Sequence, residues 1–202
     1  AAAIAKGKHV ISDKPLAMTA ADGKKLLDQA TKAGIVHAVT FNYRGNPLVQ
    51  QARHAIARGD IGKPHFLVGH YLQDWLLKDT DYSWRLEPDK GGPTSALGDV
   101  GSHWCDLAEH ITGLRITEVL ADVTTTIKTR RKPAKTETFQ SASNAATTPV
   151  NITVEDLASV LLRFDNGARG SFSVGQVCAG HKNDLQIEVS GGSGSVKWRQ
   201  EQ

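Results

Sequence analysis

Over the first forty-five residues, short apolar runs alternate with a helical stripe. The β-branched run Lys8–Ser12 and the later run Ile35–Phe41 are typical of buried strands in an α/β sheet. Between them, Thr19 is a candidate N-cap with Asp22 three residues on, and the apolar stripe that follows stops at Gly34. The pattern predicts a βαβ unit, with a right-handed connection if its strands are parallel.

The helical period returns after Arg44 and then gives way to an irregular stretch. Asn46–Gly59 has an N-cap, a proline at the first helical position and a glycine stop, so it predicts a helix. His65–Gln73 predicts a strand, Asp74–Leu97 an aromatic loop of functional type, and Gly101–Thr112 a second helix.

Beyond residue 115 the pattern is that of strands and hairpins. Asp165–Gly167 is a strong hairpin signal, and the glycine-rich stretch 191–194 predicts a second turn. The polar stretch Thr129–Asn151 predicts a mobile loop. The expected strands are Ile116–Thr126, Glu155–Phe164, Ala168–Val177, Leu185–Val189 and Ser195–Trp198.

Composition narrows the class of protein. The chain has 202 residues and a formal net charge of +3, well short of a nucleic-acid-binding footprint. Its densest basic run, Lys128–Lys135, is interpreted as a solvated loop. Cys105 and Cys178 are too few for a disulfide framework and indicate a reducing, cytoplasmic location. No apolar run approaches the roughly 20 residues that span a bilayer, so no membrane partner is expected.

Two segments carry candidate chemistry. Asp99 and His103 are four positions apart, so on an α-helix both side chains would project to the same side. Far upstream, Asp13-Lys14-Pro15 could supply a lysine to the same site. A lysine, a carboxylate and an imidazole suit removal of a proton from an alcohol. By itself, the Asp99 to His103 spacing is also typical of a capped, solvated helix start.

Four ordered motifs give a more specific indication. Gly7–Pro15, Asn42-Tyr43-Arg44, Gly59–Gly62 and Gly98–Asp106 together resemble the Gfo/Idh/MocA family of nicotinamide-dependent sugar and inositol dehydrogenases. Asp13 stands where that family more often has glutamate, which keeps the carboxylate. The aromatic stretch after Tyr71 looks most like the branch that acts on anhydrosugars such as levoglucosan, or on related pyranosides.

The resemblance implies an α/β fold, α+β overall. Residues 1–45 would be the C-terminal remnant of a Rossmann dinucleotide-binding domain. Residues 46–202 would form an α/β substrate domain with a large, mostly antiparallel open sheet, which is incomplete at its C-terminus if a closing helix is missing. The open sheet would also make the protein a homo-oligomer, a dimer or a tetramer.

The resemblance also assigns roles to residues. Lys14 would sit beside the nicotinamide and the reacting hydroxyl, His103 would be the general acid or base, and Asp99 would position substrate or imidazole. The implied cofactor-binding residues are Asp13, Lys14, Pro15, Asn42 and Arg44; the implied substrate-binding residues are Tyr43, Gln73, Trp75, Trp84, Asp99 and His103. Trp104 and Tyr71 are interpreted instead as core residues, and no metal ligands are assigned.

The cofactor would be NAD or NADP, but its phosphate-binding Gly-x-Gly-x-x-Gly is not in this sequence. We therefore expect a fragment that lacks about ninety residues at its N-terminus, corresponding to three βα units of roughly 30 residues each. The whole protein would be an NAD(P)-dependent dehydrogenase of CH–OH donors, and the fragment alone would be inactive. The alternative is a carbohydrate-binding or structural remnant without the cofactor cradle. Less favoured are a metal site on the helix that carries His103, Asp106 and His110, and a nucleophilic Cys105.

Overall fold

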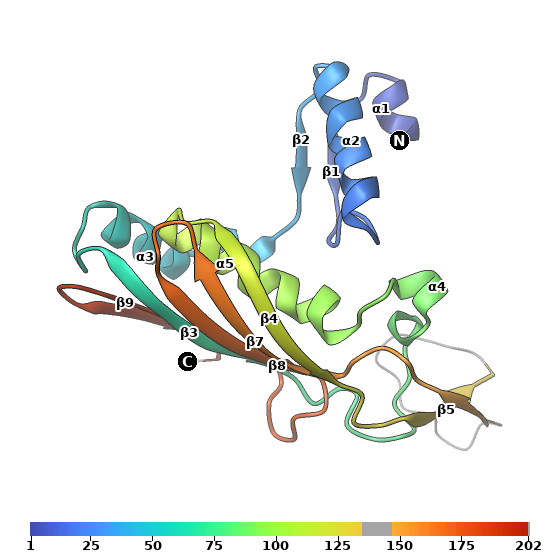
Figure 1. The fold of residues 1–202 in the computed structure, drawn as a ribbon. Helices are drawn as coiled ribbons and strands as arrows, with labels where there is room; N and C mark the ends of the chain where they lie inside the picture. Colours follow the sequence, from blue (N-terminus) through green and yellow to red (C-terminus); the bar gives the residue numbers. More distant parts are fainter. Residues whose placement is uncertain (135–146, 202) are drawn as a thin grey trace. The chain divides into compact units, whose positions relative to one another are not determined.

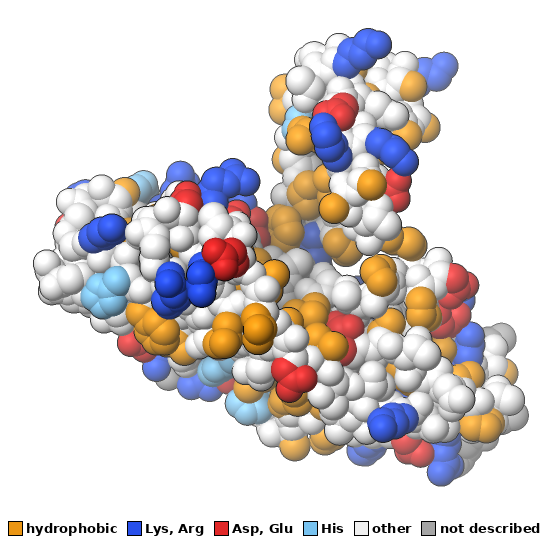
Figure 2. All heavy atoms as spheres, viewed as in Figure 1, with side chains coloured by type: hydrophobic (Ala, Val, Ile, Leu, Met, Phe, Trp, Pro, Cys, Tyr) orange, Lys and Arg blue, Asp and Glu red, His pale blue; other side chains and the backbone are white. Residues whose placement is uncertain are grey.

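The computed structural model describes residues 1–134 and 147–201 (Figure 1). Contacts divide the chain into two compact units, Ala1–Asn42 and Tyr43–Gln202, and each is described here by itself. Within the described residues, no helix is long and apolar enough to cross a membrane. Lysine and arginine side chains are interspersed with acidic ones on the face seen in Figure 2, in keeping with the small net charge.

The first unit is the predicted βαβ arrangement. It consists of α1 (Ala2–Ala5), β1 (Val10–Ser12), α2 (Ala20–Lys32) and β2 (His37–Val39). The two strands pair in parallel. Thr19 caps α2 as predicted, because its hydroxyl accepts a hydrogen bond from the Asp22 amide at 3.1 Å.

The second unit is built on a six-stranded sheet of order β10-β9-β3-β8-β7-β4 (Figure 1). Only β3 and β8 pair in parallel; every other neighbouring pair is antiparallel, so the predicted mostly antiparallel sheet is confirmed. The strands are β3 (Pro64–Leu72), β4 (Ile116–Thr124), β7 (Leu157–Phe164), β8 (Arg169–Gly175), β9 (Asp184–Gly191) and β10 (Ser195–Arg199). The helical segments are η1 (Asn42–Gly45), α3 (Pro47–Ala57), η2 (Trp84–Leu86), α4 (Pro88–Gly91), η3 (Leu97–Gly101) and α5 (Ser102–Thr112).

One face of this sheet packs against α5 to form the core. The Trp104 ring lies parallel to that of Phe172, with centroids 4.4 Å apart, and its Nε1 donates to the carbonyl of Gln186 at 3.0 Å. Gly69 leaves room for this contact, since a Cβ there would lie 2.6 Å from Trp104 Nε1. Trp104 is fully buried, as predicted.

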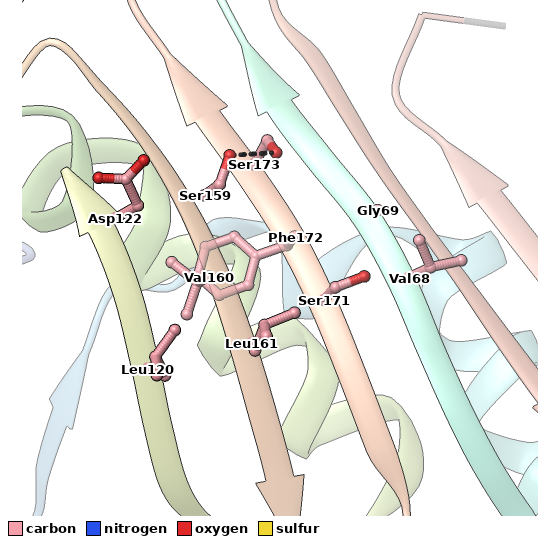
Figure 3. A pocket seen from close by; sticks show the side chains of 10 residues that line it. All are labelled: Val68, Gly69, Leu120, Asp122, Ser159, Val160, Leu161, Ser171, Phe172 and Ser173. Atoms are coloured by element: carbon pink, nitrogen blue, oxygen red, sulfur yellow. Dashed lines mark hydrogen bonds between the residues drawn. The ribbon is translucent and has the colours of Figure 1, made fainter. Parts of the chain in front are cut away.

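The opposite face of the sheet carries exposed apolar side chains and a shallow pocket. Figure 3 shows Leu120 of β4 and Leu161 of β7 on this face, next to the hydrogen-bonded hydroxyls of Ser159 and Ser173, 3.2 Å apart. Leu120 is 66% exposed and Leu161 57%. Alternate side chains of each strand point to opposite faces of the sheet, and here the outward-pointing set includes apolar residues that remain exposed.

The predicted loop Thr129–Asn151 is wrong at both ends, where β5 (Thr129–Pro133) and β6 (Thr147–Asn151) form an antiparallel pair. The solvated interpretation of the basic run is wrong for Arg130, whose side chain is fully buried, although Arg131 beside it is exposed. Arg130 Nη1 donates to the carbonyls of Lys78 at 2.8 Å and Asp81 at 3.0 Å. A distant turn thus supplies the acceptors that allow a charged strand residue to be buried. Residues 135–146 of the predicted loop lie outside the described part.

Candidate functional site

Asp99 and His103 lie on successive helical segments of different pitch. Asp99 is in the π-helical turn η3, and His103 is in the first turn of α5. The Ser102 hydroxyl donates to the Gly98 carbonyl inside this turn at 2.9 Å. The two residues therefore lack the simple α-helical spacing expected from sequence. Such π-turns within helices occur frequently at functional sites.

The His103 imidazole packs against two tyrosines that also contact each other. It is 7% exposed, and its ring centroid lies 5.1 Å from that of Tyr43, edge to face, and 6.2 Å from that of Tyr71. Tyr71 is buried, as predicted for a core residue, but its hydroxyl is 2.7 Å from the Tyr43 hydroxyl. Burial raises the pKa of Tyr71 well above its usual range. The phenol thus stays protonated.

Asn183, which the sequence did not indicate, connects these tyrosines. Its Oδ1 accepts from the Tyr71 hydroxyl, and its Nδ2 donates to the Tyr43 oxygen at 3.0 Å. Tyr71 has a single hydroxyl proton, which it donates to Asn183, so the proton between the two phenols must come from Tyr43. The donor and the acceptor of each hydrogen bond between Asn183, Tyr43 and Tyr71 are therefore fixed. Asn183 directly precedes β9 and belongs to no motif that could have revealed it.

Two predicted sugar-binding residues join the same network. Gln73 Nε2 donates to Asn183 Oδ1 at 3.1 Å, and Trp75 Nε1 donates to Gln73 Oε1 at 2.8 Å. The fold thus brings Tyr43, Gln73, Trp75 and His103 to one part of the second unit, with Asn183 at the centre.

The Asp99 carboxylate has its own set of neighbours. Gln176 Nε2 donates to Asp99 Oδ2 at 2.9 Å, and Arg85 Nε lies 3.7 Å from Asp99 Oδ1. Trp84, a predicted sugar-binding residue, is 40% exposed and lies under the Arg85 guanidinium, with 4.7 Å from the ring centroid to Arg85 Cζ. Gln176 was not indicated by the sequence, because it carries no motif and follows an ordinary strand.

The predicted cofactor residues of the first unit lie at the carboxyl end of its parallel strands. Asp13 follows β1, and its Oδ1 accepts from the Lys14 amide at 2.8 Å and from the Thr40 hydroxyl at 2.9 Å. Dinucleotides bind at this edge of parallel sheets. Asp13, Lys14 and Pro15 therefore fit the binding of a nicotinamide cofactor, while the glycine loop that would cradle its phosphates is not in this sequence.

Arg44 contacts Asp106, which is also one of the residues of the alternative metal site. Arg44 Nε donates to Asp106 Oδ2 at 2.8 Å in a two-pronged ion pair, so Asp106 is bonded to a cation. Over residues 1–134 and 147–201, no group of three or more metal-ligating side chains is placed to hold an ion. Burial raises the pKa of the Cys105 thiol to about 12, which is unfavourable for a nucleophile.

Comparison with known proteins matches both units. The GFO/IDH/MocA C-terminal domain matches residues 49–197, and the oxidoreductase family with an NAD-binding Rossmann fold matches residues 1–41. The chain is 34% identical over 202 residues to levoglucosan dehydrogenase of Pseudarthrobacter phenanthrenivorans, covering 99% of this chain and 51% of the relative.

Solved structures agree with this assignment. An oxidoreductase domain protein from Kribbella flavida is 39% identical with a TM-score of 0.88, over 98% of this chain and 51% of that one. A levoglucosan dehydrogenase in complex with NADH and L-sorbose is 34% identical with a TM-score of 0.87, over 98% and 49%. The chain spans about half the length of these proteins. With both units matched in chain order, the chain belongs to the Gfo/Idh/MocA family of oxidoreductases.

Proposed function

We propose that the protein containing this chain is an NAD(P)-dependent oxidoreductase that transfers a hydride between a sugar or cyclic polyol carbon and the nicotinamide. The observation that carries the proposal is the packing of His103 against Tyr43 and Tyr71, in a network that also holds Gln73 and Trp75. Relatives named as levoglucosan dehydrogenase, one of them in complex with NADH and L-sorbose, support the same class of reaction.

Each catalytic residue has a separate role in this proposal. His103 accepts the hydroxyl proton, since a neutral imidazole can do so near pH 7. Asp99 positions the substrate hydroxyl or the imidazole. Lys14, which belongs to the first unit, stabilises the developing alkoxide with its ammonium group.

The cofactor, when bound, supplies the hydride acceptor. Asp13, Lys14, Pro15 and Asn42 are the residues of this chain that would hold it, at the edge where Asp13 and Thr40 are hydrogen-bonded. Arg44 was expected in this group, and its guanidinium would have to exchange its contact with Asp106 to take part.

The substrate we propose is a pyranoside or an anhydrosugar. Sugars present apolar C–H faces to aromatic rings and hydroxyl groups to amides. Tyr43, Trp75 and Gln73 provide both kinds of group within one network, and Trp84 adds an exposed ring beside Arg85.

We also propose that the protein is a homo-oligomer that uses the open face of the sheet. The exposed Leu120, Leu161 and Phe66 lie on this face, and apolar surface of this kind favours association. The side chains around its pocket come from β3, β4, β7 and β8 (Figure 3).

His103→Ala in the complete gene product tests the catalytic assignment. We expect kcat to fall by about 100-fold or more, in the range that general acid–base catalysis contributes, with cofactor affinity nearly unchanged. His54→Ala is the matched control, because His54 is exposed on α3. Steady-state kinetics and titration of nicotinamide fluorescence measure the two quantities. Equal losses of kcat and cofactor affinity would contradict the assigned role.

A further inference from the structure

We propose that Gln176 is a positioning residue that fixes the direction of the Asp99 carboxylate. The inference rests on the proposed function, because it requires that Asp99 take part in the reaction. It adds a residue that lies 77 positions away in the sequence and belongs to none of the motifs discussed above.

Gln176 is rigidly held by its own backbone. It follows β8 directly, and its side chain is fully buried. Its amide N–H donates to the Asp156 carbonyl at 3.0 Å, and its carbonyl accepts from the Leu76 amide at 3.0 Å. Because both backbone groups of Gln176 are hydrogen-bonded, the position of its Cα is fixed, and the side chain extends from that position.

The side-chain amide has one favourable orientation. The Ser95 hydroxyl donates to Gln176 Oε1 at 3.2 Å, which leaves Nε2 to donate to Asp99 Oδ2 at 2.9 Å. A flipped amide would place its oxygen against a carboxylate, and two acceptors repel. Ser95 is itself fixed, since its backbone N–H donates to Glu155 Oε1 at 2.9 Å.

Arg85 contributes differently from Gln176. Its Nε lies 3.7 Å from Asp99 Oδ1, too far for a hydrogen bond but close enough for attraction between the charges. Arg85 is also partly exposed, whereas Gln176 is fully buried. The guanidinium therefore supplies charge, and the Gln176 amide supplies a donor of fixed direction.

Gln176→Glu and Gln176→Leu separate this role from simple packing. Both variants lack the donor toward pH 9, where the introduced glutamate is ionised, and there we expect kcat/KM for the sugar to fall about 10- to 100-fold, as when one hydrogen bond to a charged group is lost. Only the Gln176→Glu side chain can donate again when protonated. Its facing carboxylate raises the pKa of the introduced acid, so protonation begins at an accessible pH.

The measurement is kcat/KM of each variant relative to wild type between about pH 5 and 9, the range over which a carboxyl paired with a second carboxylate takes up its proton. We expect the ratio to recover toward low pH for Gln176→Glu and to stay flat for Gln176→Leu. Ser95→Ala, which keeps Gln176 but releases its amide, should show a smaller loss and serves if the buried substitutions do not fold. Gln51→Glu, exposed on α3, is the matched charge control and should behave as wild type.

Asp99→Asn and the wild-type gene product, assayed alongside, distinguish failure of this inference from failure of the proposed function. Failure of the wild-type gene product to oxidise any pyranoside or cyclic polyol with NAD(P) would overturn the proposed function, whereas wild-type kinetics for Asp99→Asn would remove the role of Asp99 and, with it, the role of Gln176. A strong loss for Asp99→Asn with wild-type kcat and KM for Gln176→Leu would overturn only the role of Gln176. Equal, pH-independent losses for Gln176→Leu and Gln176→Glu would also overturn it, because the direction of the donor would then not matter.

Discussion

Asn183→Ala should destabilise the second unit and weaken sugar binding together, because one amide connects three side chains. Asn183 Oδ1 accepts from Tyr71 and Gln73, and its Nδ2 donates to Tyr43. The substitution removes all three hydrogen bonds at once. Tyr71 is affected most, since its hydroxyl lies in a side chain that is only 4% exposed and has little access to water.

The expected cost follows from these bonds. A typical hydrogen bond contributes about 1 kcal/mol net, and a buried donor left unsatisfied costs about 1–3 kcal/mol. Gln73 and Asn183 are only partly buried, so water replaces part of what they lose. We therefore expect a decrease of about 2–4 kcal/mol in the free energy of unfolding. For a domain of this size, that corresponds to a Tm lower by roughly 5–15 °C.

A double-mutant cycle with Tyr71→Phe tests the reasoning directly. Urea unfolding is measured for wild type, Asn183→Ala, Tyr71→Phe and the double variant. If the Tyr71 hydroxyl is the group left without an acceptor, Asn183→Ala should cost at least about 1 kcal/mol less in the Tyr71→Phe background. Costs that add within about 0.5 kcal/mol would refute the coupling. Sugar affinity, followed by intrinsic tryptophan fluorescence, should fall in the same variants.

Two further predictions concern buried charges. Arg130→Ala should lower the free energy of unfolding in urea by about 3–5 kcal/mol, since it removes a buried cation from carbonyl acceptors and from Asp156. Arg131→Ala breaks an exposed ion pair and should cost about 1 kcal/mol or less. Similar costs for the two variants would contradict the assumption that burial makes the difference. Hydrogen bonds from Arg199 hold the pKa of Asp184 well below its usual range, so its stabilisation is complete above the unfolded value of about 4 and is lost as pH falls through the folded one. Asp184→Asn should therefore flatten the decline of stability below about pH 4, and an unchanged acid profile would count against this assignment.

Local signals in the sequence were sufficient for most elements of the fold. Thr19 and Asn46 cap the helices that they were predicted to begin. The Asp165–Gly167 turn joins β7 and β8 as an antiparallel pair. Caps and tight turns involve atoms only a few residues apart, so their energies act wherever the sequence occurs. His103, Gln73 and Trp75 could be proposed as candidate site residues because the motifs and aromatic stretches that carry them are contiguous, and the fold brings them into one part of the second unit.

The tertiary structure alone decided how these residues are held. Asn183 lies 112 positions from Tyr71, Gln176 lies 77 from Asp99, and Arg130 is buried against carbonyls about fifty residues away. Asparagine, glutamine and arginine are ordinary surface residues by sequence. Each is buried or half-buried here beside distant groups that accept or donate its hydrogen bonds, which for Arg130 are made by Nη1. The π-turn at Asp99 likewise departs from the α-helical spacing that the sequence indicated. The sequence thus determined the elements and the kinds of chemical group in the site, while long-range packing determined the direction in which each group points.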